Sequence, residues 1–279
     1  LGAHLNEALG LETDPDALVD LRLGRLDGPE RPLLVVLGLV REHLRITAGG
    51  WTPPAPRTVV IAREASGPPT DKRAERSLRA ARAVADAINR DPRARSVLRV
   101  AVLPECTAPV VPLLAAAADL SNQPSTAGSG AAGARALGLA VGGAVTLGTR
   151  DGTVREIQDA VGEESLFLYG LAPLEARAWH DGRVYRPRDV YTLDPLVRRS
   201  LDELVSPRYA PEGGGHDWIR EALLDRDDPW LVLADFGAYV HRQDEALAEF
   251  ADPRTFTEKA ILTLGRCRRF WAGDGDLER

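Results

Sequence analysis

Short apolar runs alternate with amphipathic stretches through the first 170 residues. Such runs predict buried parallel strands at 57–62, 97–103, 144–147 and 166–169, and the first of them is a continuous β-branched run. Between them apolar positions recur every three or four residues, which predicts helices at 31–45, 72–90, 108–117, 135–141 and 153–161. Strands separated by helices indicate an α/β fold with a Rossmann-like, doubly wound parallel sheet.

The two ends of the chain follow other patterns. Residues 1–30 are polar and broken by turn signals, and after residue 172 only helical periodicity remains. The predicted late helices lie at 190–205, 218–224, 236–250 and 253–268. We therefore expect one domain over 1–279, with a leading segment 1–30, a Rossmann core 31–171 and a helical C-terminal extension 172–279.

Composition excludes several functional classes. The 279-residue chain has a net charge of −6, which argues against a general nucleic-acid or membrane surface. No transmembrane run and no signal peptide are present in the sequence. Cys106 and Cys267 lie far apart and fit no metal or redox spacing, which predicts reduced thiols, a cytoplasmic protein and no metal site.

The basic residues are almost all arginine, since Lys72 and Lys259 are the only lysines. Together with the abundant alanine, this bias indicates a bacterial source of high GC content. The chain has no methionine, so we expect it to begin inside a longer protein.

A polar stretch at 117–127 leads into a glycine-rich turn and then into the helix predicted at 135–141. Backbone N–H groups at such a helix N-terminus attract anions. Gly128, Gly130 and Gly133 also spell G-x-G-x-x-G, but with 26 glycines in the chain the match alone is weak. The stretch therefore predicts an anion cradle, without identifying the anion.

Several segments resemble, in the same order, motifs of one enzyme family. Residues 117–128 resemble AADLSEQISTAG, 143–152 resemble NGALTIGTMDG, and 162–170 resemble GEENfFiFG. Residues 18–26 are similar to the start of slFDVqvKRiHEYKRQ. These are motifs of the C-terminal half of the glycogen/starch (α-glucan) phosphorylases, members of glycosyltransferase family 35, and the resemblance covers nearly the whole chain.

The resemblance implies the C-terminal domain of a two-domain GT-B glycosyltransferase architecture, whose N-terminal domain we expect to be absent from this chain. It also implies a family chemistry. Members hold pyridoxal phosphate as a Schiff base on a lysine, and the cofactor phosphate assists attack of inorganic phosphate on a terminal glucose.

The sequence departs from the family at the residues that carry this chemistry. In an alignment without gaps, the positions of the cofactor lysine, the sugar-binding glutamate, two further lysines and a pocket aromatic hold Gly138, Gly130, Gly24, Glu30 and Cys106. A glycine cannot form an imine, and Glu30 reverses a charge that attracts an anion in the family. We therefore predict that pyridoxal phosphate is absent.

Part of an anion site survives. Arg25 stands where the family has a phosphate-contacting arginine, and Arg135 follows the glycine-rich turn. The candidate anion-binding residues are Arg25, Gly133, Ala134 and Arg135, with phosphate or a sugar phosphate as the expected ligand. In the alternative interpretation, both arginines are solvated or paired with the acidic residues at 27 and 30.

These departures predict a degenerate phosphorylase-like protein without phosphorolytic activity and without catalytic residues. We expect a non-catalytic, partner-binding role, with a phosphorylase-like N-terminal domain, a partner protein or a second copy as partner. The alternative is a repurposed, pyridoxal-independent enzyme. Its glycosyltransferase-like cleft, completed by a partner or a missing domain, would take a phosphorylated or sugar-like substrate and serve specialised metabolism.

Other residues are assigned structural roles. His216 follows three glycines, which predicts a linker, and no histidine lies in a context that would activate Ser125 or Ser129. The tryptophans at 179, 218, 230 and 271 are predicted to pack between helices rather than to form sugar platforms.

Overall fold

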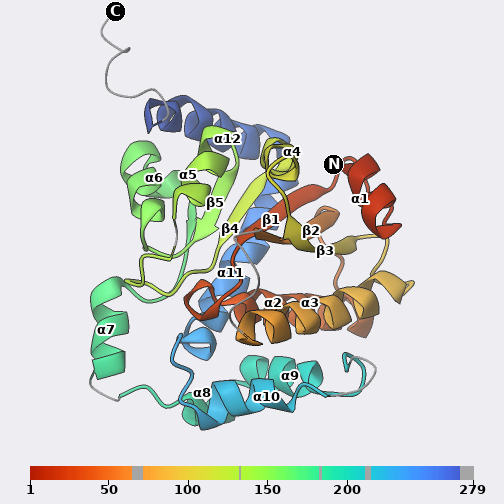
Figure 1. Ribbon diagram of the computed structural model, residues 1–279, viewed down its shortest axis with the longest axis vertical. Coiled ribbons are helices and arrows are strands. Elements are labelled where there is room, and N and C mark those ends of the chain that lie inside the picture. Colours follow the sequence, from red (N-terminus) through yellow and green to blue (C-terminus); the bar gives the residue numbers. More distant parts are fainter. Residues whose placement is uncertain (65–71, 132, 182–183, 211–214, 271–279) are drawn as a thin grey trace, which may run out of the picture.

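The computed structural model describes residues 1–64, 72–131, 133–181, 184–210 and 215–270. Six strands form one sheet in the order β3-β2-β1-β4-β5-β6, and every neighbouring pair is parallel (Figure 1). Their bounds are Leu18–Gly24 (β1), Arg57–Glu64 (β2), Leu98–Cys106 (β3), Leu120–Gln123 (β4), Val145–Gly148 (β5) and Phe167–Leu168 (β6). The predicted Rossmann-like α/β class is therefore confirmed.

Two of the six strands are not among those that the hydrophobic pattern predicts. β1 lies inside the leading segment, and β4 begins the stretch that the sequence suggests is a polar loop. Both carry polar side chains in the core: Asp20 and Arg22 in β1, and Asn122 in β4, are each at most 2% exposed. A rule that looks for unbroken apolar runs fails here because these polar groups are buried with polar partners: Asn122 donates to Asp20, and Arg22 pairs with Glu30.

The two faces of the sheet follow the period-2 alternation of strand side chains. In β2, Val59 and Ile61 join the larger core, whereas Val60 and Ala62 point to the smaller one. Helices α2 (Pro32–Ala48), α3 (Lys72–Arg90) and α11 (Val232–Phe250) cover the first face. The second face carries α1 (Gly2–Leu9), α4 (Val110–Ala117) and α5 (Ala134–Val141), with α6 (Thr153–Val161) and α12 (Pro253–Cys267) packed beside α5.

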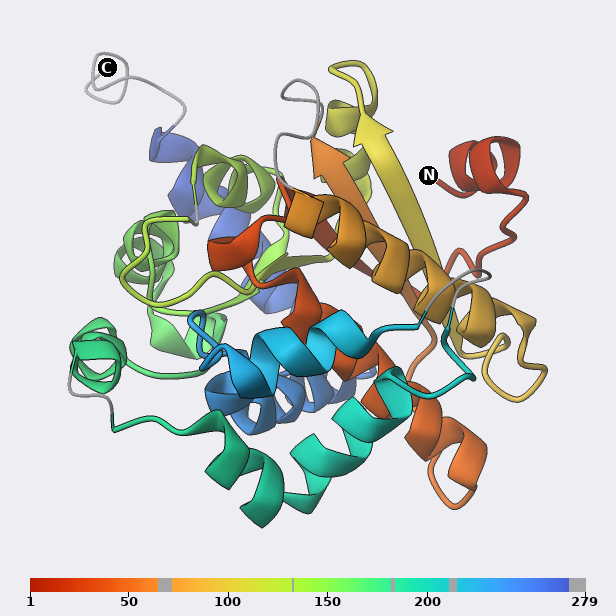
Figure 2. The same cartoon turned by 60° about the horizontal axis from the view of Figure 1, so that its bottom comes forward.

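No described residue after β6 forms a strand, which confirms a helical C-terminal extension. It begins with α7 (Pro173–Asp181), α8 (Pro187–Leu193), α9 (Pro195–Leu204) and α10 (Asp217–Arg220), and α10 continues into a π-helical turn, η3 (Glu221–Asp225). Figure 2 shows α9 and α10 as an outer layer over α2. The single helix predicted at 190–205 is two helices, because Pro195 breaks it and Asp194 caps the second part.

The prediction that His216 belongs to a linker is wrong. Its side chain is 2% exposed, and its Nε2 lies 2.9 Å from the carbonyl oxygen of Tyr209. Its preceding glycines at 213 and 214, and Trp271, lie outside the described residues. The imidazole anchors the start of α10 to the chain after α9.

Candidate functional site

The sheet has a topological switch point between β1 and β4. From these two strands the chain order runs outward in opposite directions, so the loops after their carboxyl ends diverge and leave a crevice. The loop after β1 contains the short helix η1 (Gly28–Glu30), and the loop after β4 contains the glycine-rich turn and leads to α5. The fold therefore brings most of the residues singled out in the sequence to one edge.

Glu30 lies at the centre of this edge and is 2% exposed. Its Oε2 accepts hydrogen bonds from Nη2 of Arg22 at 2.6 Å and from the Leu26 amide at 3.0 Å. Its Oε1 accepts from Nη2 of Arg135 at 2.8 Å, and Nε of Arg25 lies 3.7 Å away. Three guanidinium groups thus surround one carboxylate that the chain itself supplies.

Burial raises the pKa of Glu30, but the Arg22 guanidinium, the Leu26 amide and Arg135 together outweigh it and hold that pKa below its ordinary value. The carboxyl group is therefore ionised at neutral pH. The position that in the resembled family attracts an anion is itself an anion here.

Both candidate arginines are paired with acidic residues. Arg135 also donates from Nη1 to Glu64 at 2.6 Å, and Nε of Arg25 lies 3.2 Å from Asp27. This is the paired arrangement of the alternative interpretation. Arg25 remains 52% exposed and Arg135 26% exposed, so each still presents part of its side chain to solvent.

Gly24 has no room for a side chain. A Cβ atom there would lie 2.2 Å from Oε2 of Glu30 and 2.7 Å from Nη1 of Arg22. The ion pair between Arg22 and Glu30 therefore occupies the space into which a lysine at position 24 would extend.

The glycine-rich turn is also occupied from within. Asp151, which follows β5, accepts hydrogen bonds from the Gly130 amide at 2.9 Å, the Ala131 amide at 3.1 Å and the Ser129 hydroxyl at 3.1 Å. Its side chain is buried. These two backbone N–H groups are therefore not free to receive an external anion, although Gly133 and Ala134 still begin α5.

Gly138 and Cys106, two further positions at which the sequence departs from the family motifs, lie away from the cluster around Glu30. Gly138 is in the middle of α5, and a Cβ there would meet nothing within 4 Å. Cys106 ends the edge strand β3, two strands away from β1, which separates the strands by about 10 Å. Cys106 is buried in the smaller core, where burial raises the pKa of its thiol to about 11.

Arg31 is a structural centre of the site that the sequence reasoning did not single out. It is fully buried; its Nε donates to the Pro124 carbonyl at 2.6 Å and its Nη1 to Asp235 at 2.6 Å. It thereby joins the loop after β1 to the loop after β4 and to α11. Arg22 and Glu64 were also missed, but the alternation of Asp20 and Arg22 with apolar residues could have revealed β1 and its buried charges.

The described residues contain no group of three or more His, Cys, Asp or Glu side chains placed to hold a metal ion. Within the same part of the chain, no helix is both long and apolar enough to cross a bilayer.

A parallel sheet in this order, with loops that diverge at its switch point, defines a Rossmann-like α/β protein. Comparison with known families identifies which Rossmann-like family this is, because a profile of the carbohydrate phosphorylases matches residues 1–274. The chain belongs to the carbohydrate phosphorylase family.

Among characterised relatives, the chain is 27% identical to glycogen phosphorylase of Bacillus subtilis over 94% of its own length and 32% of that protein. It is 30% identical to glycogen phosphorylase of a Synechocystis strain over 97% of its length and 31% of that protein. It is 29% identical to the muscle form of human glycogen phosphorylase over 96% of its own length and 32% of that protein. The chain thus spans about a third of the length of the relatives it matches.

Proposed function

We propose that this protein is a phosphorylase-family member that holds no covalent pyridoxal phosphate, performs no phosphorolysis and acts by binding a partner. The observation that carries the proposal is the ionised Glu30 carboxylate, enclosed by Arg22, Arg25 and Arg135 at the switch point. A phosphate brought to this edge would meet a fixed negative charge, and the guanidiniums that could bind it already have a carboxylate partner.

The lysines support the same proposal. The imine position holds Gly138, and neither lysine of the chain offers an obvious replacement. Lys259 lies on α12, 2.7 Å from Glu249 and over the ring of Phe167, and Lys72 begins α3 as an exposed residue. The residues of the edge therefore do not fit the family's cofactor.

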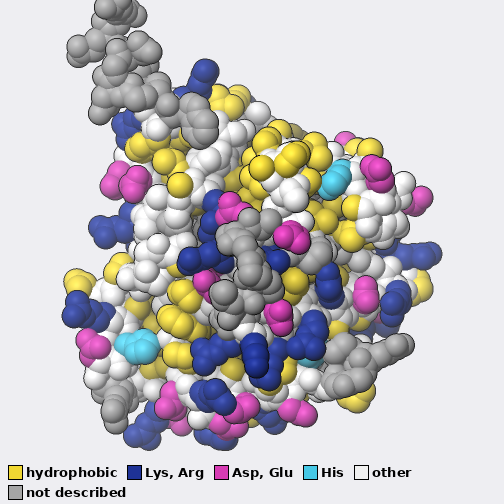
Figure 3. Space-filling view, in the orientation of Figure 1, with side chains coloured by type: hydrophobic (Ala, Val, Ile, Leu, Met, Phe, Trp, Pro, Cys, Tyr) yellow, Lys and Arg dark blue, Asp and Glu magenta, His cyan; other side chains and the backbone are white. Residues whose placement is uncertain are grey.

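A partner-binding role has a surface to support it. Apolar side chains gather over α4 on the second face of the molecule (Figure 3). Leu113 of α4 is 38% exposed, Leu9 of α1 is 43% exposed, and Ile261 of α12 is 65% exposed. We propose that this side meets a phosphorylase-like N-terminal domain or a second copy of the chain.

The cofactor experiment uses the purified protein with glycogen phosphorylase of Bacillus subtilis as the positive control. Both are incubated with pyridoxal phosphate, treated with borohydride and analysed by intact and peptide mass spectrometry. We expect no stoichiometric adduct on this chain and no phosphate-dependent release of glucose 1-phosphate from glycogen. A one-to-one adduct on Lys72 or Lys259, or phosphorolysis above background, would refute the proposal.

The partner proposal is tested separately by light scattering after size exclusion. Self-association that Leu113→Glu abolishes would support the second copy, and a complex with a separately expressed N-terminal domain that the same variant abolishes would support that partner. Retention of either complex by Leu113→Glu, or a monomer that binds no such domain, would contradict the proposed surface.

A further inference from the structure

A pocket of about 250 Å³ lies on the other side of the loop after β1, between α2, α3 and the α10–η3 segment. Part of its inner surface is apolar, formed by Leu26, Leu33, Leu223 and Val232, none of which is more than 8% exposed. Neither Glu30 nor the glycine-rich turn contributes to its lining. It is therefore distinct from the edge that aligns with the family's cofactor residues.

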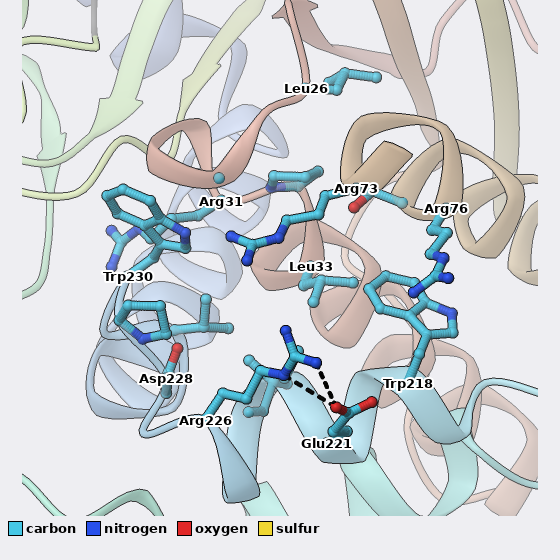
Figure 4. Close-up of a pocket in the computed structure, with 17 residues that line it drawn as sticks. Leu26, Arg31, Leu33, Arg73, Arg76, Trp218, Glu221, Arg226, Asp228 and Trp230 are labelled. Atoms are coloured by element: carbon cyan, nitrogen blue, oxygen red, sulfur yellow. Dashed lines mark hydrogen bonds and ion pairs between the residues drawn. The ribbon is translucent and has the colours of Figure 1, made fainter. Parts of the chain in front are cut away.

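Two indole rings form walls of the pocket. Trp218 comes from α10 and Trp230 from the loop after η3, and Figure 4 shows them on opposite sides of the hollow. Gly28 keeps the Trp230 ring close to the backbone, since a Cβ at that glycine would lie 2.4 Å from the indole Nε1. The prediction that these tryptophans pack between helices describes only part of their surface, because both also face the pocket. Indole faces favour flat rings as partners.

The rim of the pocket is basic. Arg73 and Arg76 extend from the first turns of α3, and Arg73 reaches toward the space between the indoles (Figure 4). On the opposite rim, Arg226 is held by Glu221 through contacts of 2.6 and 3.0 Å. Basic side chains also gather in this region in the space-filling view (Figure 3). In a chain with a net charge of −6, this concentration of arginine is a local reversal of charge.

Two buried polar groups in the lining lack a complete set of partners. Arg31 is fully buried, and its Nη2 has no hydrogen-bond acceptor among the described residues. Arg31 lines the pocket together with Asp228, whose Oδ1 also has no hydrogen-bond partner among the described residues. A buried guanidinium N–H without an acceptor, or a buried carboxylate oxygen without a donor, is unfavourable, so either would be stabilised by a ligand polar atom that reaches it.

We propose that this pocket binds a small organic anion that combines one flat ring system with one phosphate or carboxylate group. The ring lies between Trp218 and Trp230, and the anionic group meets Arg73 and Arg76 at the mouth. The volume and the partly apolar inner surface suit a small molecule rather than a polymer. The proposal goes beyond the proposed function, because it uses neither a cofactor nor the switch-point edge.

The test uses 1-naphthyl phosphate as the probe, with calorimetry and tryptophan fluorescence in low salt. Inorganic phosphate lacks the ring and 2-naphthol lacks the charge. We expect saturable one-to-one binding of 1-naphthyl phosphate, at least tenfold tighter than either fragment, and weaker binding as salt is raised. Absence of saturable binding, or a fragment that binds as tightly as the probe, would overturn the proposal.

A matched pair of variants locates the site. Arg76→Gln should weaken binding of the probe about tenfold, because it removes a charge-assisted contact. Arg79→Gln, an exposed arginine one turn further along α3 and outside the pocket lining, should leave it unchanged. Because both side chains are exposed, both variants should fold, which circular dichroism verifies. Equal affinities of the two variants would place the probe elsewhere.

Discussion

Replacing Glu30 with glutamine tests whether the chain's own carboxylate holds the switch point together. The variant keeps the size of the side chain and removes its charge. Arg22, only 3% exposed, is then left without a counter-ion in the interior. Removing one partner of a buried ion pair costs about 3–5 kcal/mol of unfolding free energy. We expect Glu30→Gln to lower the unfolding free energy by about 3 kcal/mol, at the lower end of this range. The glutamine oxygen can still accept a hydrogen bond from the Leu26 amide, and water can solvate the partly exposed Arg135.

The assay is urea denaturation monitored by circular dichroism, with Glu64→Gln as the control. Glu64 also pairs with Arg135, but at 35% exposure, so its loss should cost less than about 1 kcal/mol. If Glu30→Gln is no more destabilising than Glu64→Gln, the ion pair is not a structural centre and the reasoning fails.

The pH dependence gives a second check of the same reasoning. The pKa of Glu30 is lower in the folded protein than in the unfolded chain, so its contribution is complete above the unfolded pKa of about 4.3. It is lost as the pH falls through the folded pKa. The difference in stability between the wild type and Glu30→Gln should therefore be constant near neutrality and shrink below about pH 4.3. A gap that persists unchanged in acid would contradict this origin.

Phosphate rescue provides the third check. In Glu30→Ala the arginines lose their carboxylate and gain space, so inorganic phosphate should bind and stabilise the variant. At about five times its dissociation constant, phosphate would add about 1 kcal/mol. The wild type should show no such gain over chloride at equal ionic strength. Equal stabilisation of both proteins would show that the carboxylate does not occupy an anion site.

Three further predictions concern other parts of the fold. Arg57→Met should lower the unfolding free energy by about 3–5 kcal/mol, because it leaves two buried carboxylates without the guanidinium that contacts them. Arg79→Gln should change the unfolding free energy by less than about 0.5 kcal/mol, and denaturant titration measures both variants. Cys106 and Cys267 should react with Ellman's reagent at pH 8 only after unfolding, because burial raises the pKa of both thiols, in Cys106 to about 11; fast labelling of the folded protein would contradict this. Burial lowers the pKa of His43 in the folded state, so the unfolded chain takes up a proton first and stability should fall as the pH drops below about 6.5. His43→Gln should remove this fall from a plot of the denaturation midpoint against pH.

The sequence predicts the apolar strands and the long helices well, because their signals are local. β2 contains a continuous β-branched run, β3 an apolar run at 100–103, and α3 keeps its apolar positions on one face. β1 escapes the pattern because Asp20 is buried by pairing with Arg57, a residue 37 positions away. Pairing at that distance is invisible to a search for short hydrophobic runs.

In the candidate site, too, the sequence predicts what local motifs carry and misses what depends on contacts between distant residues. Alignment with the family motifs alone predicts a glycine at the cofactor-lysine position and an acid in place of a lysine at position 30. The enclosure of Glu30 by Arg22 and Arg135 depends on β1 lying beside β4, a pairing that only the folded sheet reveals. The pocket between the two tryptophans joins helices more than 140 residues apart, so no local motif announces it.

The tight contact between Gly24 and Glu30 also constrains how this protein can change over time. A lysine introduced first at position 24 would drive its Cβ into the Glu30 carboxylate. A lysine introduced first at position 30 would place a fourth cation beside Arg22, Arg25 and Arg135 and remove the carboxylate that all three face. A lysine at either position is therefore unfavourable while the other position is unchanged, so a protein with lysine at both positions cannot be reached through either single substitution without a loss of stability.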